Sequence, residues 1–183
     1  FASRAQDAWN AGQRWDAIVC CDMLDLAEFK GLVPSELSNL PTVVYFHENQ
    51  LTYPVRSEDA RDLHFAFSNF TTAVAADAVW FNSGFHRREF LDALGTWLRK
   101  MPDYQPESHV AALTSKSSVQ SPGVEVPANP PSTMDGPLRI LWAARWEHDK
   151  NPEDFFAALR ILDRRGVPFR LSVVGQTFRE VPA

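Results

Sequence analysis

Short apolar runs alternate with helical segments along the chain, and this alternation limits the possible folds more than any other feature of the sequence. The clearest of these mainly apolar runs span residues 17–21, 42–46, 78–81 and 138–144. Strands buried on both faces of a parallel sheet read as continuous apolar runs, whereas half-exposed strands alternate with polar residues. The pattern therefore predicts an α/β fold with parallel sheets that helices cover on both faces.

Proline and glycine divide the chain into three parts. Residues 121–137 hold five prolines and two glycines in 17 residues, a composition typical of a linker. We expect a Rossmann-like domain over residues 1–120, a linker over 121–137 and the start of a second Rossmann-like domain over 138–183. The chain begins with Phe rather than Met, and the second domain ends before it could close. We therefore expect a segment of a longer protein.

Composition and charge narrow the possible functions. The chain has 45% hydrophobic and 22% charged residues, and no apolar run approaches the roughly 18–20 residues that span a bilayer. Cys20 and Cys21 are adjacent in an apolar run, which suits a reduced, buried pair in a cytoplasmic protein better than a disulfide. The net charge of −5 argues against a dedicated nucleic-acid surface. Four basic residues nevertheless gather in one region, where a solvated helix face is the simpler explanation: Arg87, Arg88, Arg99 and Lys100.

A cluster of four polar residues directly follows the apolar run at 42–46: His47, Glu48, Asn49 and Gln50. It could be a metal site, a ligand site at the end of a strand, or an ordinary polar turn. A zinc-protease helix needs a second histidine four residues after the first, and that position is Leu51. Asn49 and Gln50 are also poor zinc ligands. The sequence thus favours ligand binding without a metal, or a turn. For Asp22 and Asp25 it favours a turn and a helix cap.

Two further polar clusters follow predicted strands, namely Asn82–Ser83 and Arg145–Lys150. Each alone is more often a turn than a site, but ligands of open α/β sheets bind at the carboxyl ends of strands. Arg145 and Lys150 precede a helix that Asn151 caps, so two cations and a helix N-terminus would converge on an anionic diphosphate. No Gly-x-Gly-x-x-Gly or Walker pattern is present, which argues against a dehydrogenase or a P-loop enzyme.

Three motifs make the chain resemble a known enzyme family: "YFHENQLTYP", "VWFNSGFHRREFL" and "RWEHDKNPEDFF". Together with the "PGV" linker and the Arg-x4-Lys spacing, they are similar to the tRNA-queuosine α-mannosyltransferases. These are GT-B glycosyltransferases, built from two Rossmann-like domains, and belong to the large retaining group (family 4). The resemblance extends from about Cys21 to Pro182.

The resemblance implies transfer of mannose from GDP-mannose to a hydroxyl of the queuosine base in a tRNA, with retained configuration and no metal or other cofactor. Arg145 and Lys150 would bind the donor diphosphate and stabilise the departing GDP. His47 and Glu48 would be the catalytic candidates, although an ion pair with a nearby arginine explains Glu48 equally well. The remaining expected site residues are Asn49, Gln50, Asn82 and Ser83 on the acceptor side, and Gly175 near the nucleotide.

Two other functions remain open at this point. One is a GT-B transferase with another donor, or with a glycan or lipid acceptor, and the other is a non-catalytic binding module. The resemblance also implies that a first strand with its glycine loop and a Glu-x7-Glu region lie outside these residues. We therefore expect the isolated chain to be inactive and only its full-length form to be an enzyme.

Overall fold

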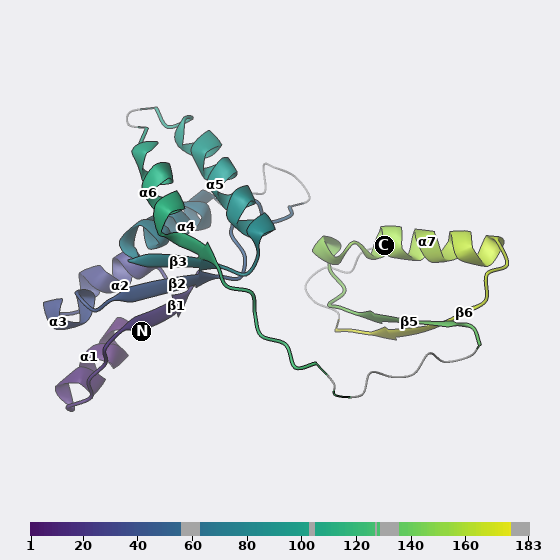
Figure 1. Ribbon diagram of the computed structural model, residues 1–183, viewed down its shortest axis with the longest axis horizontal. Helices are drawn as coiled ribbons and strands as arrows, with labels where there is room; N and C mark the ends of the chain where they lie inside the picture. The colour runs from purple at the N-terminus through teal and green to yellow at the C-terminus, as the bar shows by residue number, and fades with distance from the viewer. Residues whose placement is uncertain (56–62, 103–104, 127, 129–135, 177–183) are drawn as a thin grey trace. The chain divides into compact units, whose positions relative to one another are not determined.

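The computed structural model describes residues 1–55, 63–102, 105–126, 128 and 136–176 (Figure 1). The chain divides into two compact units, one formed by Phe1–Tyr53 and Asp59–Val124, the other by Pro54–Glu58 and Glu125–Ala183. Each unit has its own parallel sheet, which confirms the predicted α/β class. The predicted helical residues 58–62 and eight of the 17 predicted linker residues, 127 and 129–135, lie outside the described residues.

The first unit carries a sheet of four parallel strands in the order β1-β2-β3-β4. Pro41 precedes β2, and the β-branched and aromatic residues that follow it favour a strand. The elements are α1 (Ala2–Asn10), β1 (Ile18–Cys21), α2 (Leu26–Leu32), α3 (Ser35–Ser38), β2 (Thr42–Phe46), α4 (Leu63–Ala75), β3 (Ala78–Phe81), α5 (Gly84–Leu98), α6 (Ser108–Lys116) and β4 (Ser117–Val119).

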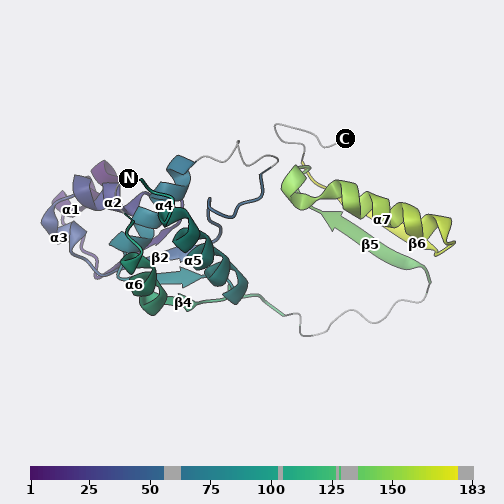
Figure 2. The same cartoon turned by 90° about the horizontal axis from the view of Figure 1, so that it is seen from above.

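Among the described residues of this unit, the connecting helices cover one face of the sheet, so the expectation of two covered faces was wrong for this part of the chain. Its strands follow one another in chain order, and connections between parallel strands are right-handed, so every connecting helix arrives on the same face. Helices α4, α5 and α6 accordingly lie over one face in both views (Figures 1 and 2). On β2, Val44 and Phe46 are fully buried, whereas Val43 and Tyr45 on the opposite face are partly exposed.

Three phenylalanine rings form the centre of the core beneath the helices. Phe46, Phe81 and Phe90 are fully buried, and their ring centroids lie 5.1–5.6 Å apart. Burial of a side chain of this size stabilises a fold by about 1.5–3 kcal/mol. Phe46 and Phe81 are the last residues of β2 and β3. Their packing therefore fixes where these strands end and where the polar clusters His47–Gln50 and Asn82–Ser83 begin.

Two lysines bind the carboxyl end of α4. Lys30 Nζ donates to the carbonyl of Ala75 at 2.9 Å, and Lys116 Nζ donates to the carbonyls of Val74 (2.8 Å) and Ala76. Positive charge at this end complements the helix dipole. Burial lowers the pKa of Lys116. These contacts join α2 and α6 to α4, the helix that carries Asn69 towards the sheet edge.

The second unit contains β5 (Leu138–Ala143), a 3-10 turn η2 (His148–Lys150), α7 (Pro152–Arg164) and β6 (Phe169–Val174). The two strands are parallel, and α7 lies along their sheet (Figure 1). Helix α7 begins as predicted, with Asn151 as its cap and Pro152 at its first position. Trp142 of β5 packs against Phe155 of α7, with 4.4 Å between ring centroids. None of the helices in the described ranges has both the length and the apolar character needed to cross a membrane.

The two cysteines are free thiols at the end of β1, as predicted, but they are only partly buried. Burial raises the pKa of Cys20 to about 11, and the neighbouring Cys21 adds to the shift. A thiol with so high a pKa stays protonated at neutral pH and is a poor nucleophile. Cys20 therefore serves packing within the sheet rather than nucleophilic chemistry.

Candidate functional site

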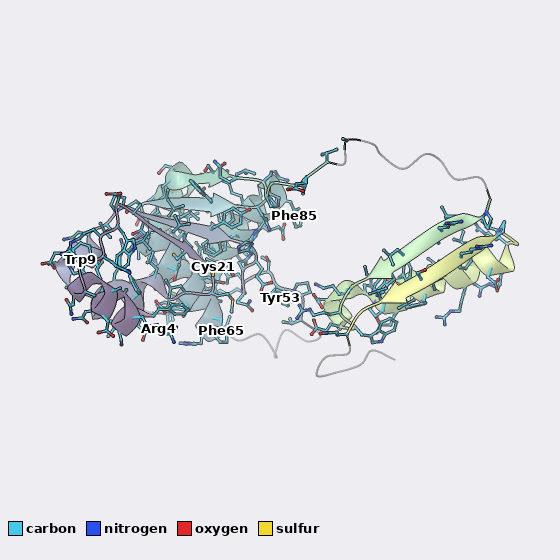
Figure 3. All side chains as sticks on the ribbon, turned by 90° about the horizontal axis from the view of Figure 1, so that it is seen from below. Arg4, Trp9, Cys21, Tyr53, Phe65 and Phe85 are labelled. Atoms are coloured by element: carbon cyan, nitrogen blue, oxygen red, sulfur yellow. The ribbon has the colours of Figure 1, made fainter. Side chains whose placement is uncertain are left out.

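Polar residues directly follow the strands of the first unit and lie at one edge of the sheet. Asp22 follows β1, His47 follows β2 and Asn82 follows β3. In a parallel sheet all carboxyl ends meet at the same edge, where open α/β sheets bind ligands. Figure 3 shows Tyr53 and Phe85, which belong to this edge, at the opposite end of the unit from Trp9. The structure thus brings together the predicted residues of the first unit.

The backbone of His47 is held from both sides. Its N–H donates to Asp22 Oδ1 at 2.9 Å, and its carbonyl accepts from Asn82 Nδ2 at 2.8 Å. Asp22 is 6% exposed, so its bond to His47 is shielded from water and correspondingly stronger. The imidazole is exposed and lies against the ring of Tyr45, with 4.7 Å between ring centroids. The chain therefore fixes the main chain at residue 47 and leaves its side chain accessible.

A small network orients Asn82. Its Oδ1 lies 3.1 Å from His86 Nδ1 and accepts a hydrogen bond from Ser83 Oγ at 3.3 Å. Because Asn82 Nδ2 donates to the carbonyl of His47, the amide oxygen faces His86, and Nδ1 of His86 carries the proton. Nε2 of His86 is then a buried acceptor, and no described group bonds to it. Burial lowers the pKa of His86, with Asp22 opposing the shift, so the imidazole is neutral at neutral pH.

Ser83 acts as the predicted cap of α5. Its hydroxyl accepts from the N–H of His86 at 3.1 Å, which satisfies one of the free donors at the start of the helix. Phe85, in the same first turn, is 67% exposed. The capping role of Ser83 is confirmed, while its contact with an acceptor stays a prediction.

Asn49 shapes the loop that follows β2. It is 3% exposed, its Oδ1 accepts from the N–H of Thr52 at 3.0 Å, and its Nδ2 donates to Thr52 Oγ1 at 2.9 Å. The N–H of Gln50 donates to Asn69 Oδ1 at 2.8 Å, and Asn69 Nδ2 donates to the carbonyl of Asp22 at 3.1 Å. Helix α4 thus ties the loops after β1 and β2 together through one buried amide. The predicted contact of Asn49 with an acceptor is untested.

Glu48 is exposed at the same edge. Its carboxylate accepts from Gln50 Nε2 at 3.4 Å, and no ion pair with an arginine is formed among the residues that the structure describes. In the same part of the chain, no three His, Cys, Asp or Glu side chains are arranged to hold a metal ion together. Glu48 therefore presents an accessible carboxylate at the carboxyl-end edge of the sheet.

A cavity of about 510 Å³ lies beside this loop, at the end of β1. Three of its lining residues, Asp22, Gln50 and Asn69, also belong to the hydrogen-bond network around His47. Further lining residues come from the β1–α2 loop, from α2 and from α4. Phe65, labelled in Figure 3, belongs to the α4 side.

Arg145 and Lys150 lie in the segment between β5 and α7 of the second unit. Arg145 forms an ion pair with Glu147 at 3.4 Å, and Lys150 Nζ donates to the carboxylate of Asp149. The side chain of Arg145 is 52% exposed and that of Lys150 is 37% exposed. Each cation therefore has a carboxylate partner within its own loop and keeps part of its surface accessible.

The N-terminus of α7 is already occupied by the chain's own groups. Asn151, with a left-handed φ of 49°, accepts from the N–H of Asp154 at 3.4 Å. Glu153 and Asp154 also place negative charge in the first turn. This arrangement stabilises the helix but opposes an anion there. Of the predicted diphosphate ligands, the two cations are thus better placed than the helix N-terminus.

Gly175 follows β6 and lies directly against the preceding strand end. A Cβ atom at this position would lie 1.9 Å from the carbonyl oxygen of Ala144, closer than any side chain tolerates. Only glycine fits here, and the reason lies within the chain. The predicted approach of a nucleotide to Gly175 is a separate matter and stays a prediction.

Sequence reasoning missed three residues of this edge: Asp22, Asn69 and His86. The expected cap role was right for Asp25, which accepts from the N–H of Glu28 at 2.9 Å, but Asp22 instead holds His47. Asn69 gave one usable signal, since it is polar within the mainly apolar helix α4. The partners of these buried groups are distant in sequence, so residue spacing did not reveal them.

Comparisons with known proteins agree with these motifs. The family described as tRNA-queuosine alpha-mannosyltransferase N-terminal matches residues 1–124. A curated tRNA-queuosine alpha-mannosyltransferase of Drosophila melanogaster is 34% identical over 171 residues, which cover 87% of this chain and 45% of that relative. The chain thus spans about half the length of this curated relative. No solved structure matches it. Since the family match covers the whole described first unit, the chain belongs to the tRNA-queuosine alpha-mannosyltransferase N-terminal family.

Proposed function

We propose that the full-length protein transfers mannose from GDP-mannose to a hydroxyl of the queuosine base in a tRNA, with retained anomeric configuration. The observation that carries the proposal is the backbone of His47, held by two hydrogen bonds at the sheet edge where open α/β proteins bind ligands, within the residues that the family matches. The name of the Drosophila relative supports mannose transfer to queuosine in a tRNA. The proposal includes a GT-B arrangement of the two units and a cytoplasmic location.

On the donor side, Arg145 and Lys150 bind the diphosphate. Two cations close to one strand end can share its charge and stabilise the nucleotide as it departs. Glu147 and Asp149 hold these side chains before the donor arrives, and the diphosphate then replaces them as the partner. No metal ion or other cofactor takes part, and Gly175 lies near the nucleotide.

On the acceptor side, His47 and Glu48 present the accessible imidazole and carboxylate. Both can accept or donate a proton at a sugar or acceptor hydroxyl, the kind of transfer that general acid–base catalysis uses. Gln50, Asn82 and Ser83 line the acceptor side around them. The backbone bonds of His47 keep its Cα in place, which reduces the ordering cost of reaching a reactive geometry.

The test is to incubate the full-length protein with GDP-mannose and with tRNA that contains or lacks queuosine. We expect mannose on the queuosine-containing tRNA alone, joined with the configuration it had in the donor, and no transfer by the 183-residue chain. Mass spectrometry of the nucleosides and NMR of the product check both points. Equal transfer to both tRNAs, or to neither, would contradict the proposal and favour another acceptor or a non-catalytic module.

The diphosphate assignment predicts the effect of Lys150→Ala. The variant should keep its fold but lose a charge-assisted contact of about 1.5–3 kcal/mol, which weakens GDP-mannose binding by about 10- to 150-fold. Arg145→Lys should also weaken binding, because an ammonium cannot replace a bidentate guanidinium. Arg164→Ala, at the other end of α7, is the matched control. Unchanged binding by Lys150→Ala would remove Lys150 from the site.

A further inference from the structure

Two polar side chains lie on the buried face of α4, among apolar neighbours. Asn69 is 4% exposed and Thr72 is fully buried, and the same face carries Ala66, Phe70 and Ala73. A buried polar group destabilises a fold unless it is hydrogen-bonded, so packing alone would favour apolar residues at both positions. The hydrogen-bond partners of the two side chains therefore show what each of them contributes.

Thr72 serves the connection between β1 and α2. Its hydroxyl accepts from the N–H of Leu26 at 3.0 Å and donates to the carbonyl of Leu24 at 3.0 Å. Leu26 is the first residue of α2, and Leu24 lies in the loop before it. Neither bond reaches the loop that follows β2. Thr72 thus secures the start of α2.

Asn69 differs from Thr72 because its two bonds end on separate loops. Its Oδ1 accepts from the N–H of Gln50 at 2.8 Å, and its Nδ2 donates to the carbonyl of Asp22 at 3.1 Å. Asp22 Oδ1 in turn accepts from the N–H of His47 at 2.9 Å. The amide of Asn69 is therefore bonded directly to one end of the segment His47–Gln50 and, through Asp22, to its other end.

The segment between these two bonds carries the accessible groups of the candidate site. The imidazole of His47 and the carboxylate of Glu48 are exposed, whereas the main chain at His47 and Gln50 is held by buried side chains. The place of an exposed side chain depends on the backbone that carries it. A displacement of about 1 Å can reduce a reaction rate by about a hundredfold.

We propose that Asn69 is a positioning residue for sugar transfer. It sets the backbone of the segment His47–Gln50, and it acts through Asp22 and the main chain rather than on a substrate. This role rests on the proposed function, because it requires that His47 and Glu48 act on the acceptor. Arg145 and Lys150 belong to the second unit, so loss of the amide lowers kcat and leaves the KM for GDP-mannose unchanged.

The experiment compares Asn69→Leu with Thr72→Val in the full-length protein. Each variant replaces a buried polar side chain by an apolar one of similar size, and each removes one accepted and one donated hydrogen bond. Their unfolding midpoints should therefore fall by similar amounts. For mannose transfer to queuosine-containing tRNA, we expect kcat to fall about ten- to a hundredfold in Asn69→Leu but less than about twofold in Thr72→Val.

Amide hydrogen exchange, followed residue by residue by NMR, provides a second measurement that does not need activity. In Asn69→Leu the N–H of Gln50 loses its acceptor, and the N–H of His47 is weakened because Asp22 is no longer held. Both should exchange about tenfold faster, as the loss of one net hydrogen bond predicts. In Thr72→Val the N–H of Leu26 should respond instead, while those of His47 and Gln50 keep their rates.

An equal loss of kcat in the two variants, or an unchanged kcat in Asn69→Leu, would overturn the proposal. Unchanged exchange of His47 in Asn69→Leu would overturn it as well. If Asn69→Leu does not fold, Asn69→Ser, whose smaller side chain leaves room for water beside Gln50, decides by the same criteria. Absence of mannose transfer by the unaltered full-length protein would contradict the proposed function, and the exchange rates then decide alone whether Asn69 positions the segment.

Discussion

The side chain of Asn82 joins the loop after β2 to the first turn of α5. Its amide group donates to the carbonyl of His47 after β2, and its oxygen faces His86 Nδ1 in the first turn of α5. His86 in turn packs edge-on against Phe81, with 5.2 Å between ring centroids. The main chain at His47 is therefore linked, through one amide, to the aromatic core.

Replacement of Asn82 by alanine should destabilise the first unit. The variant leaves Nδ1 of the buried His86 without its partner, which costs about 1–3 kcal/mol, whereas water can replace Asn82 at the exposed carbonyl of His47. Urea unfolding followed by tryptophan fluorescence measures the loss. Asn39→Ala, at an exposed position without a described side-chain hydrogen bond, should stay within about 0.5 kcal/mol. Equal effects of the two variants would show that the Asn82 network carries no stability.

His86 should make the stability of the first unit depend on pH. Its pKa is lowered from the ordinary 6.5 by burial, so below pH 6.5 the unfolded chain takes up a proton before the folded chain does. Stability is therefore complete above pH 6.5 and falls as the pH drops towards the lower pKa of the folded state.

The check compares unfolding midpoints of the original chain and His86→Gln from about pH 7.5 to about pH 5.5. His86→Gln should be less stable at neutral pH but should lose less stability on acidification. Parallel pH curves for the two proteins would mean that another group causes the acid sensitivity.

At the scale of elements, the success of sequence reasoning depended on whether the signal was local. Strand β2 was predicted with its observed bounds, Thr42–Phe46, because Pro41 precedes a continuous run of β-branched and aromatic residues. The caps Ser83 and Asn151 were also predicted correctly, since a cap binds a group only three residues away. Strand β4 was missed because two serines in three residues give no apolar run.

Tertiary arrangement gave no such local signal. Apolar strands suggested helices on both faces, but the side on which helices lie follows from strand order, which emerges only when the sheet forms. Arg87 illustrates the same limit for the site, because it donates to Ser117 Oγ at 2.7 Å and to the carbonyl of Thr114 at 2.9 Å. The sequence grouped it with the basic residues of a solvated helix face, whereas its partners lie 27 and 30 residues further along the chain.

The end of β6 should not tolerate a side chain at residue 175. In Gly175→Ala the new Cβ would overlap the carbonyl oxygen of Ala144, so the two strand ends must separate. Overpacking of this kind costs about 1–3 kcal/mol. Amide hydrogen exchange of β5 and β6 reports the change. Gly123→Ala, where a Cβ meets nothing within 4 Å, is the control and should leave exchange unchanged.

At the scale of the whole molecule, an acidic chain must bind a polyanion if the proposed function holds. The net charge is −5, so contact with tRNA requires local basic groups. Arg87 is engaged within the fold, and Arg99 forms an ion pair with Glu107 at 3.7 Å. Arg88 and Lys100 are exposed, which leaves them as the basic residues of this region best able to reach a phosphate.

Removal of Arg88 should reduce the salt dependence of tRNA binding. Each lost phosphate contact lowers the slope of log K against log salt by roughly 0.7–0.9. Filter binding of the full-length protein and its Arg88→Ala variant, across a series of salt concentrations, measures the slope. Arg4→Ala on α1, which Figure 3 shows away from Phe85 and the first turn of α5, should not change it. An identical slope for Arg88→Ala would place the RNA contact elsewhere.

The way His47 is held also affects how this protein can evolve. Both bonds that fix the residue end on its peptide groups, so neither depends on which side chain follows the Cα. A substitution at position 47 or 48 therefore alters the group offered to a substrate while the path of the chain stays the same. At this edge the backbone hydrogen bonds are kept whichever side chains stand at positions 47 and 48. New acceptor preferences can therefore be selected there at little cost in stability.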